Sequence, residues 1–512
     1  MIPNDTLANP KRTATPPCTV TRDTSEFENP LSILSDVVES RETAEAYETK
    51  RPWTGAADEW ESPLARLTAE QLEQLGREFD AIHDEVRADL GERDSRYIRA
   101  TIKLHRQLVL GARAMLLGSR YKPLWLAGTL SLSIAKILEN MEIGHNVMHG
   151  QWDWMNDPDI NSQNWDWDTA SPADAWRHSH NYVHHTFTNI RGKDRDLGYE
   201  IMRVDPHQRW HPVYLLQPFY NLLLMGFFEW GVALHDLDFD AIKSGEKSKE
   251  QLLEELKGIG LKARRQIVKD YIAFPLLSAV LAGAIRGTTG RGSTDPQLAD
   301  PKAADPHATA IRRTAKAASS LAQIIRLAPK TTGPLAKTTR RAPKATGRQA
   351  EDRGGAATAG GIGSAAGRAY KSTLTADFTA NIVRNVWAYS IIFCGHFPDQ
   401  TYTFSQAEVA EETRGGWYVR QLLGSANIDG GPLFHLMAGN LSFQVEHHLY
   451  PDIPSSRYAE IAPRVRDVCQ RYGLPYNTGP LHKQLGNVHR TILRLALPGG
   501  KPRSKPGPYR PA

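Results

Sequence analysis

The chain has 512 residues, which is enough for several domains, and it combines a net charge of +5 with a mean hydropathy of −0.46. Its three cysteines are far apart in the sequence, which excludes a disulfide framework and a cysteine-based zinc ribbon. The basic excess is concentrated in residues 286–372, so the net charge does not indicate a protein that binds nucleic acid over its whole surface.

The first part of the chain changes from polar to amphipathic. Residues 1–58 are predicted to form a disordered leader, because proline, threonine and charged residues dominate and no apolar period is sustained. Residues 58–91 carry apolar residues at helical spacing between charges, which predicts an amphipathic surface helix. Residues 97–118 continue with many basic residues, so we expect them to lie at a membrane interface or to insert shallowly.

Residues 121–143 are the first strong membrane candidate. A helix needs about 20 mostly apolar residues to span a bilayer, and this stretch comes close. Its apolar run WLAGTLSLSIAKIL contains one charged residue, Lys136, and we expect this side chain to extend toward the headgroups.

Three more apolar stretches follow, at 212–234, 270–285 and 375–397. The first is long enough to cross a membrane, but a proline and a glutamate interrupt it. The second is short, and the third is the last strong candidate. The charged residues 236–269 predict a soluble helix between the first two.

Histidines form three clusters, each bordered by apolar or aromatic residues. In chain order the clusters are His145 and His149, then His180, His184 and His185, and then His447 and His448. Residues four apart lie on one face of an α-helix, so the histidines at that spacing point the same way. Neutral imidazole is the commonest metal ligand in proteins. The three clusters together predict one shared metal site.

The sequence around these histidines is similar to that of a known family. HNVMH, HNYVHH and QVEHH resemble the three histidine boxes of the membrane fatty acid desaturase family. The longer runs EIGHNVMHGQWDWMNDP, WRHSHNYVHHTFTNIRGKDRDLGYE and GNLSFQVEHHLYPDIPSSRY resemble its actinobacterial acyl-CoA or acyl-lipid desaturase branch. The resemblance covers residues 64–481, apart from one interruption.

This resemblance implies an all-α fold: an integral membrane helical bundle with a cytoplasmic helical cap that holds a histidine-box diiron site. It places the protein in the cell membrane with all boxes on the cytoplasmic side, so the number of crossings between the second and third boxes is even. The family comparison favours 270–286 and 375–396 as a spanning hairpin. Residues 212–234 are then an interfacial or re-entrant helix.

The resemblance also implies a ligand set for two irons. It comprises His145, His149, His180, His184, His185, His396, His447 and His448. Five further residues are candidates for contacts around these ligands: His178, His435, Gln444, Asp194 and Asp196. Gln444 stands where other branches of the family carry a histidine, and His435 is an alternative ligand. Metal-bound imidazoles usually donate their second N–H to a carboxylate or a carbonyl, which is why the two aspartates are candidates.

The reaction that the resemblance implies explains why a metal is needed. Removal of hydrogen from an unactivated methylene needs a stronger oxidant than any side chain, so a redox metal must activate O2 as co-substrate. Iron bound by imidazoles with open positions suits this task. The implied function is an O2-dependent desaturase that introduces a cis double bond into a long-chain acyl-CoA or acyl-lipid. The interaction partners are then the acyl substrate and membrane lipid, with no nucleic acid.

Two reducing electrons must come from elsewhere. GIGSAAG is the nearest approach to a dinucleotide-binding pattern, and no strand is expected before it. A separate ferredoxin, or an NADPH-dependent flavin or iron–sulfur reductase, is implied. A diiron hydroxylase or ketolase is the closest alternative function, and it would yield an alcohol or a ketone. A non-catalytic metal-handling membrane protein is the remote one, and it would move metal without consuming O2.

Domain boundaries follow from these assignments. Residues 59–285 form the first part of the desaturase domain with two boxes, and 373–481 form its second part with the third box. Between them, 286–372 is a low-complexity basic stretch that cannot bury a core, and we expect it to be disordered or weakly helical. It is either a genuine insertion or sequence read in a foreign frame. Residues 482–512 are predicted to be a C-terminal tail, and the position of the double bond is open.

Overall fold

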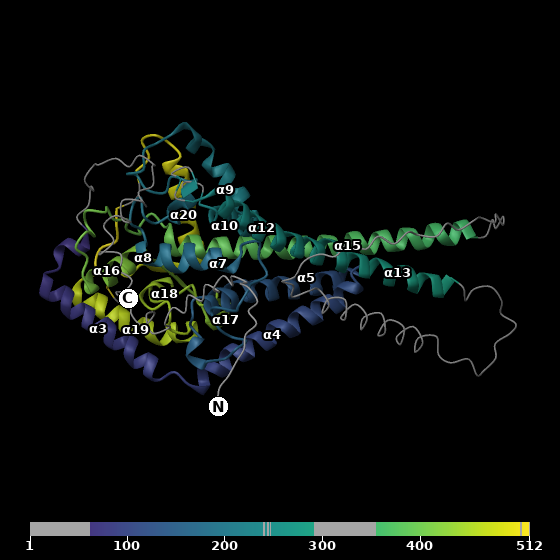
Figure 1. Ribbon diagram of the computed structural model, residues 1–512, viewed down its shortest axis with the longest axis horizontal. Coiled ribbons are helices and arrows are strands. Elements are labelled where there is room, and N and C mark those ends of the chain that lie inside the picture. The colour runs from purple at the N-terminus through teal and green to yellow at the C-terminus, as the bar shows by residue number, and fades with distance from the viewer. Residues whose placement is uncertain are drawn as a thin grey trace, which may run out of the picture. The chain divides into compact units, whose positions relative to one another are not determined.

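The computed structural model describes residues 62–238, 241–242, 245, 247–290, 355–501 and 504–510. These residues fold almost entirely into helices, so the expectation of an all-α fold is confirmed (Figure 1). One short parallel sheet, β1 (Asn427–Asp429) beside β2 (Thr478–Pro480), is the exception among them. The predicted leader, 1–58, lies outside the described residues.

Four long helices pack side by side (Figure 1). They are α4 (Glu92–Leu117), α5 (Lys122–Ile137), α13 (Phe274–Gly290) and α15 (Gly355–His396). α4 and α5 form an antiparallel hairpin, so residues 97–118, which were expected at a membrane interface or shallowly inserted, are the packing partner of α5. α13 and α15 form a second pair, and α15 also packs along α5.

Polar contacts between buried side chains join the four helices. Asp270, which precedes α13, accepts from the guanidinium of Arg113 at 2.7 Å and from the ammonium of Lys136 at 2.8 Å. Asp377 on α15 pairs with the same arginine. The expectation that Lys136 extends toward headgroups is therefore wrong, because its side chain is buried against a carboxylate. Pairing removes most of the cost of placing these charges inside the protein.

One helix among the described residues is long and apolar enough to cross a membrane. It runs without interruption over Lys249–Arg286, through α12 (Lys249–Ile267), the π-helical η8 (Val268–Ala273) and most of α13. The helix predicted to be soluble, within 236–269, and the short apolar segment at 270–285 thus belong to one continuous helix.

The apolar stretch 212–234 is not one helix. It is divided into η7 (Pro212–Leu216), α9 (Gln217–Gly226) and α10 (Phe228–His235). The backbone leaves helical geometry at Phe227, which explains why this stretch cannot be counted as a continuous span.

The flanks of the predicted low-complexity stretch are helical. α13 continues to Gly290, and α15 begins at Gly355, where the sequence alone predicted disorder or weak helix. Ala365 and Ala369 are fully buried, because small side chains let two helices approach closely. Residues 291–354 lie outside the described residues.

The other helices surround the end of this bundle. They are η2 (Pro63–Arg66), α3 (Ala69–Ala88), η3 (Leu138–His145), α6 (Asn146–Met148), η4 (Asp153–Met155), α7 (Ala173–Trp176), η5 (Arg177–His184), α8 (His185–Phe187), η6 (Leu197–Glu200), α16 (Arg414–Gly424), α17 (Pro432–Met437), α18 (Gln444–Leu449), η9 (Ser455–Arg457), α19 (Tyr458–Tyr472) and α20 (Leu481–Leu495). Local sequence sets several of their ends. Thr68 and Gln71 exchange side-chain and backbone hydrogen bonds in a capping box that starts α3, and Gly473 in a left-handed conformation ends α19.

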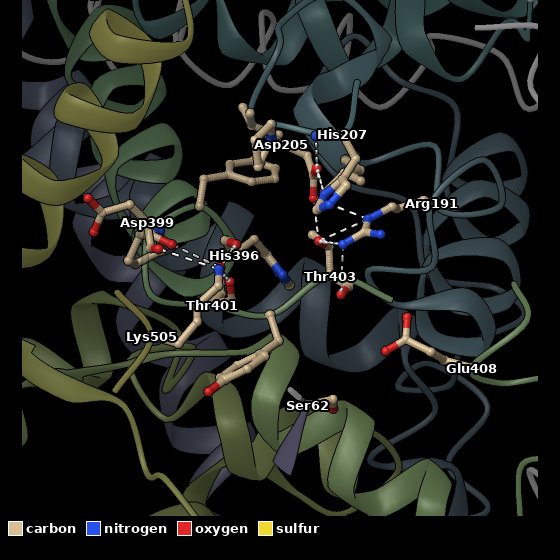
Figure 2. A pocket seen from close by; sticks show the side chains of 16 residues that line it. Ser62, Arg191, Asp205, His207, His396, Asp399, Thr401, Thr403, Glu408 and Lys505 are labelled. Carbon is tan, nitrogen blue, oxygen red and sulfur yellow. Dashed lines mark hydrogen bonds and ion pairs between the residues drawn. The ribbon is translucent and has the colours of Figure 1, made fainter. Parts of the chain in front are cut away.

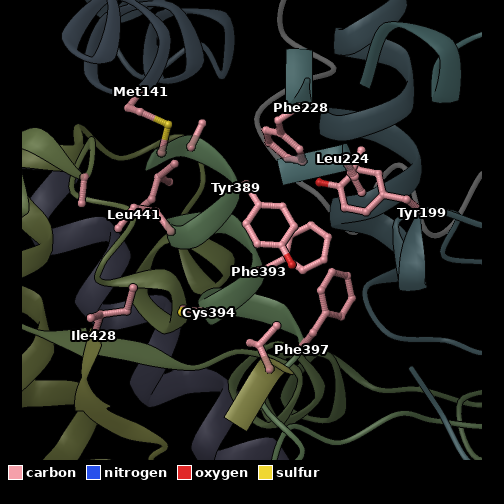
Figure 3. Packing of buried hydrophobic residues seen from close by; sticks show 14 of the residues in the cluster. Met141, Tyr199, Leu224, Phe228, Tyr389, Phe393, Cys394, Phe397, Ile428 and Leu441 are labelled. Atoms are coloured by element: carbon pink, nitrogen blue, oxygen red, sulfur yellow. The ribbon is translucent and has the colours of Figure 1, made fainter. Parts of the chain in front are cut away.

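A large buried cluster supports the last turns of α15 (Figure 3). Tyr389, Phe393 and Phe397 recur every four residues and so share one face of the helix. The first two rings stack with centroids 3.9 Å apart, and the next pair is 4.9 Å apart. Tyr199 and Phe228 pack against the central ring from the facing elements. This aromatic stack fixes the end of α15, where His396 lies.

Substitution of the central aromatic should weaken the whole unit. We expect Phe393→Ala to lower the stability by about 3–5 kcal/mol, because a large buried ring is removed and a cavity remains. Phe378→Ala on the same helix is the matched control, since this ring is 49 % exposed. Thermal unfolding in detergent should show a clear loss for the first variant only. Equal melting temperatures would contradict the assigned packing.

Candidate metal centre

The first histidine box begins at the end of the π-helical η3, which continues α5. His145 ends η3, and His149 follows α6 one turn later, with ring centroids 4.6 Å apart. The Nδ1 atom of His145 lies 3.0 Å from the side-chain oxygen of Asn146, which directs its Nε2 atom inward. The Asn146 amide in turn donates to the backbone oxygen atoms of Glu142 and Gly439. Because Gly439 shortly precedes the third box in the chain, this hydrogen bond links the first box to the segment that carries the third.

The second box spans η5 and α8, and two aspartates hold it from behind. The Nδ1 atom of His184 lies 3.1 Å from a carboxylate oxygen of Asp194. The Nδ1 atom of His180 lies 3.5 Å from Asp196. Asp194 also accepts from the backbone N–H of Asn189 at 2.7 Å, so its position is fixed by the loop that follows the box.

The third box lies on α18, and partners from two other helices orient it. The Nδ1 atom of His447 lies 3.2 Å from the hydroxyl of Tyr458, and that of His448 lies 3.0 Å from the side-chain oxygen of Gln421. His396, at the end of α15, has its Nε2 atom 3.1 Å from the Gln444 amide nitrogen.

All eight histidines expected as ligands come together in one buried cluster. Nitrogen atoms of His145, His149, His180 and His447 all lie within 4.8 Å of one another, and those of His184, His396 and His448 do the same. We call these sets the first and second groups. The ring of His185 lies between them, with its centroid 4.7 Å from that of His149 and 4.5 Å from that of His448.

Many nitrogen atoms of this cluster lack hydrogen-bond partners. Seven such atoms are buried and unpaired: Nε2 of His149, His184, His447 and His448, Nδ1 of His396, and both nitrogens of His185. A buried polar atom without a partner is costly, and lone pairs from several segments converge here. This arrangement fits a metal site, since coordination would satisfy the atoms that the protein leaves unpaired.

Electrostatics keeps most of these rings neutral, as a metal ligand must be. Burial, together with neighbouring imidazoles, lowers the pKa of His149, His185, His447 and His448 well below its usual value. His184 differs: burial lowers its pKa, but the carboxylates of Asp194 and Asp196 outweigh that effect and raise it.

The residues predicted to surround the ligands divide into two sets. Asp194, Asp196 and Gln444 contact histidines of the cluster, as described above. His178 stacks on Tyr182, and the Nδ1 atom of His435 lies 2.7 Å from the hydroxyl of Ser442. The structure therefore places His178 and His435 outside both groups.

Several supporting residues were not predicted from the sequence. Asn146 directly follows His145 in the first box, and this position next to a ligand could have predicted its contact with the histidine ring. Tyr458 and Gln421 lie on other helices, 11 and 27 positions from His447 and His448, so the fold brings each to its partner. His235 is a further case, because its Nε2 atom lies 2.9 Å from Asp196 and helps to hold that carboxylate.

Two cavities approach the cluster. One has a volume of about 70 Å³ and reaches His145 and His180. Its walls are largely apolar, with Trp167, Trp176 and Phe228 among them. The other has a volume of about 40 Å³ and reaches His396 of the second group; charged and polar side chains line it (Figure 2).

Comparison with known proteins decides what kind of protein holds this centre. The family model for fatty acid desaturases matches residues 123–290 and 295–480. Proteins named NADPH-dependent stearoyl-CoA 9-desaturase, from two strains of Mycobacterium tuberculosis, are 40% identical over 435 residues. The alignment covers 85% of this chain and 82% of theirs. The chain belongs to the fatty acid desaturase family.

More distant members match shorter parts of this desaturase. The fatty acid desaturase 2-like protein FADS2B of Mus musculus is 26% identical over 124 residues, which is 24% of each chain. No solved structure matches the desaturase. The family assignment made from the three boxes is confirmed, and the protein is an oxidoreductase of lipid metabolism. Iron is the metal that the family implies, and the donor set fits it.

The metal-free desaturase should lose stability in mild acid. The folded state keeps His149, His185, His447 and His448 neutral, whereas the unfolded chain takes up protons below about pH 6.5. The stability present above that pH is therefore lost as the pH falls. The expected slope is about 1.4 kcal/mol per pH unit for each such histidine.

Melting temperatures of chelator-treated protein between pH 7.5 and 5.5 would measure this loss. His149→Gln should make the slope shallower, and substitution of the exposed His482 by glutamine should not. A melting temperature that is independent of pH in this range would contradict the assigned burial.

Proposed function

We propose that this desaturase uses two irons and O2 to introduce a cis double bond into a long-chain acyl-CoA or acyl-lipid. One observation carries the proposal: eight imidazoles from several helices converge, and six of them have buried nitrogen atoms without a hydrogen-bond partner. The first group would hold one iron and the second group the other, with His185 next to both. Bound iron would supply the O2 activation that breaks an unactivated C–H bond.

The chain's own residues orient and isolate this chemistry. Asp194 and Asp196 hold the outer nitrogen atoms of the second box, and Tyr458 and Gln421 do so for the third, so each inner nitrogen is free to bind metal. The larger cavity offers the acyl chain a largely apolar wall beside His145, to which tryptophan and phenylalanine side chains contribute. A methylene placed there lies against the first group.

The substrate and the electron source follow from the relatives. The mycobacterial proteins are named for stearoyl-CoA and NADPH, so we infer a long-chain acyl-CoA as substrate and NADPH as the ultimate reductant. The overall reaction takes two hydrogens from the chain, two electrons from a donor and two protons from solvent, and it reduces O2 to two waters. GIGSAAG lies inside α15 rather than between a strand and a helix, which supports a separate donor protein.

The proposed membrane topology uses two hairpins, α4–α5 and α13–α15. Their exposed residues include Leu110, Leu126, Leu130 and Val280, each more than 60 % exposed, as expected of helices that face lipid. α5 and α15 both end at the histidine cluster, so both hairpins return to the same side, which we propose to be the cytoplasm. The surrounding shorter helices would form the cap.

A single histidine substitution tests the centre. His185→Gln should remove most bound iron and all new unsaturation, because this ring lies against both groups. Iron per chain in purified protein and the fatty acid profile of an expressing host are the two measurements. The matched control is His435→Gln, which should retain both. Hydroxy or keto fatty acids from the wild type would instead identify a hydroxylase or ketolase.

Asp194, which contacts the outer nitrogen of His184, should affect iron affinity without abolishing binding. Asp194→Asn keeps the shape of the side chain but removes its negative charge next to His184. We expect a weakening of iron binding by about 10–100-fold, as for other groups that orient a metal ligand. Iron affinity measured by competition with a chelator would show it. Asp174→Asn is the control, because this carboxylate is exposed and pairs only with Arg177 on the surface. Equal affinities in the two variants would count against the role of Asp194.

A further inference from the structure

A tryptophan side chain lies against the first group of histidines. The indole of Trp176 stacks on the ring of His180, with centroids 4.6 Å apart and ring planes 23° apart. Its centroid also lies 5.2 Å from that of His145 and 5.5 Å from that of His149. One indole thus contacts three of the four imidazoles in the first group, and its π system touches rings that the proposed function assigns to iron.

A second indole continues this contact away from the histidines. The ring centroid of Trp167 lies 5.0 Å from that of Trp176. The indole N–H of Trp167 donates to the backbone oxygen of Ser171 at 2.9 Å. The same side chain lies so close to Gly144 that a side chain at this glycine would meet the Cβ atom of Trp167 at 3.0 Å. Both indoles are buried, so their positions are closely defined by the packing around them.

Trp165 extends this series to the surface. It packs against the buried cluster that contains Trp167 and Trp176. Trp165 itself is half-buried, whereas its neighbours in the chain, Asn164 and Asp166, are exposed. Three indoles therefore lead from the first group of histidines to a surface loop between the first and second boxes.

A role as cavity wall accounts for only two of these rings. Trp167 and Trp176 line the acyl cavity, but leucine or phenylalanine would form an apolar wall equally well. Trp165 does not line that cavity. Indole differs from the other apolar side chains because it is readily oxidised, and it can lose an electron without first giving its proton to a base. This chemistry suits the movement of electrons.

A tyrosine also contacts the first group, but it does not reach the surface. The ring centroid of Tyr458 lies 6.0 Å from that of His447. Tyr458 is fully buried, and its hydroxyl donates to the backbone oxygen of Tyr450, which is fully buried as well. A donor protein that binds at the surface therefore comes closer to the tryptophan series than to this tyrosine.

We propose that Trp165, Trp167 and Trp176 form the route by which electrons pass from the donor protein to the first group. The proposal rests on the proposed function, which requires two electrons from a separate donor for each double bond. Each passage oxidises the donor by one electron and reduces bound iron by one, so two passages supply one turnover. No indole is consumed, and the two protons still come from solvent. Electron transfer weakens steeply with distance and is weaker across gaps than through packed atoms, which favours a series of packed rings.

Light-driven electron injection tests the route without the natural donor. Cys18 is replaced by serine, and the two other cysteines are buried. Gln163→Cys then carries a ruthenium polypyridyl label at an exposed position two residues from Trp165. In oxygen-free, iron-loaded protein, a light flash lets a soluble reductant give one electron to the label, which passes it to ferric iron. Transient absorption of the reduced label gives the transfer rate, and metal-free protein gives the decay without transfer.

Trp165→Leu should slow this transfer several-fold, because a saturated side chain replaces the ring and leaves a gap. Trp165→Phe should retain more of the rate, since an aromatic ring remains. Trp154→Leu is the matched control. Trp154 is also half-buried between the first two boxes, and its indole N–H donates to the backbone oxygen of Gln151, so its loss should leave the rate unchanged.

Two outcomes would overturn the route. The first is an equal rate in the Trp165→Leu and Trp154→Leu proteins. The second is slow transfer that accompanies lost iron or a lowered melting temperature in both Trp165 variants, since this residue would then act through the structure of its loop.

Iron content and new unsaturated chains in a host that expresses the unlabelled protein report on the proposed function separately. Desaturation with undiminished transfer in Trp165→Leu would reject the route and leave the proposed function intact. An iron-loaded protein that forms no double bond, yet transfers electrons through Trp165, would reject the desaturation and leave the route intact.

Discussion

Burial of many neutral imidazoles in one place is the constraint on which the rest of the structure depends. Seven histidine nitrogen atoms of the cluster are buried without partners. At about 1–3 kcal/mol each, their cost without metal is on the order of 10 kcal/mol, which is comparable to the whole stability of a typical domain. Metal binding and folding are therefore coupled, and the helices around the cluster must be rigid enough to hold the rings together until metal arrives.

That rigidity comes from contacts outside the cluster. The aromatic face of α15 fixes the approach of His396, and ion pairs set how the long helices align. Asp270 pairs with Arg113 on α4 and Lys136 on α5, and Asp377 on α15 shares the same arginine. Sliding one helix past another would leave a buried charge unpaired, which costs about 3–5 kcal/mol. These pairs thus hold α5 and α15 in register, so that His396 at the end of α15 reaches the cluster that contains the first box.

The sequence was sufficient for the histidines and insufficient for their surroundings. Spacing of four placed His180 and His184 together, and their rings lie 5.1 Å apart. The local geometry was not foreseen, because η3 and η5 are π-helical and no residue type marks such a turn. Lys136 was misplaced for a related reason: hydropathy describes a residue alone, whereas its partner Asp270 comes from a distant segment. Resemblance located His396, which no spacing rule could have joined to the other boxes.

The two cavities give the centre two unlike sides. The first group of histidines meets a largely apolar cavity, and the second group meets a cavity with charged walls. The proposed reaction needs this asymmetry. An alkyl chain is held only by dispersion and the hydrophobic effect, so its binding site needs an apolar surface. The two protons that form water must come from solvent, so they need a polar route. A cluster open to water on every side would have no apolar wall for the alkyl chain. A cluster sealed in apolar packing would have no polar route for the protons. A cluster that two such cavities reach would satisfy both requirements of the proposed reaction.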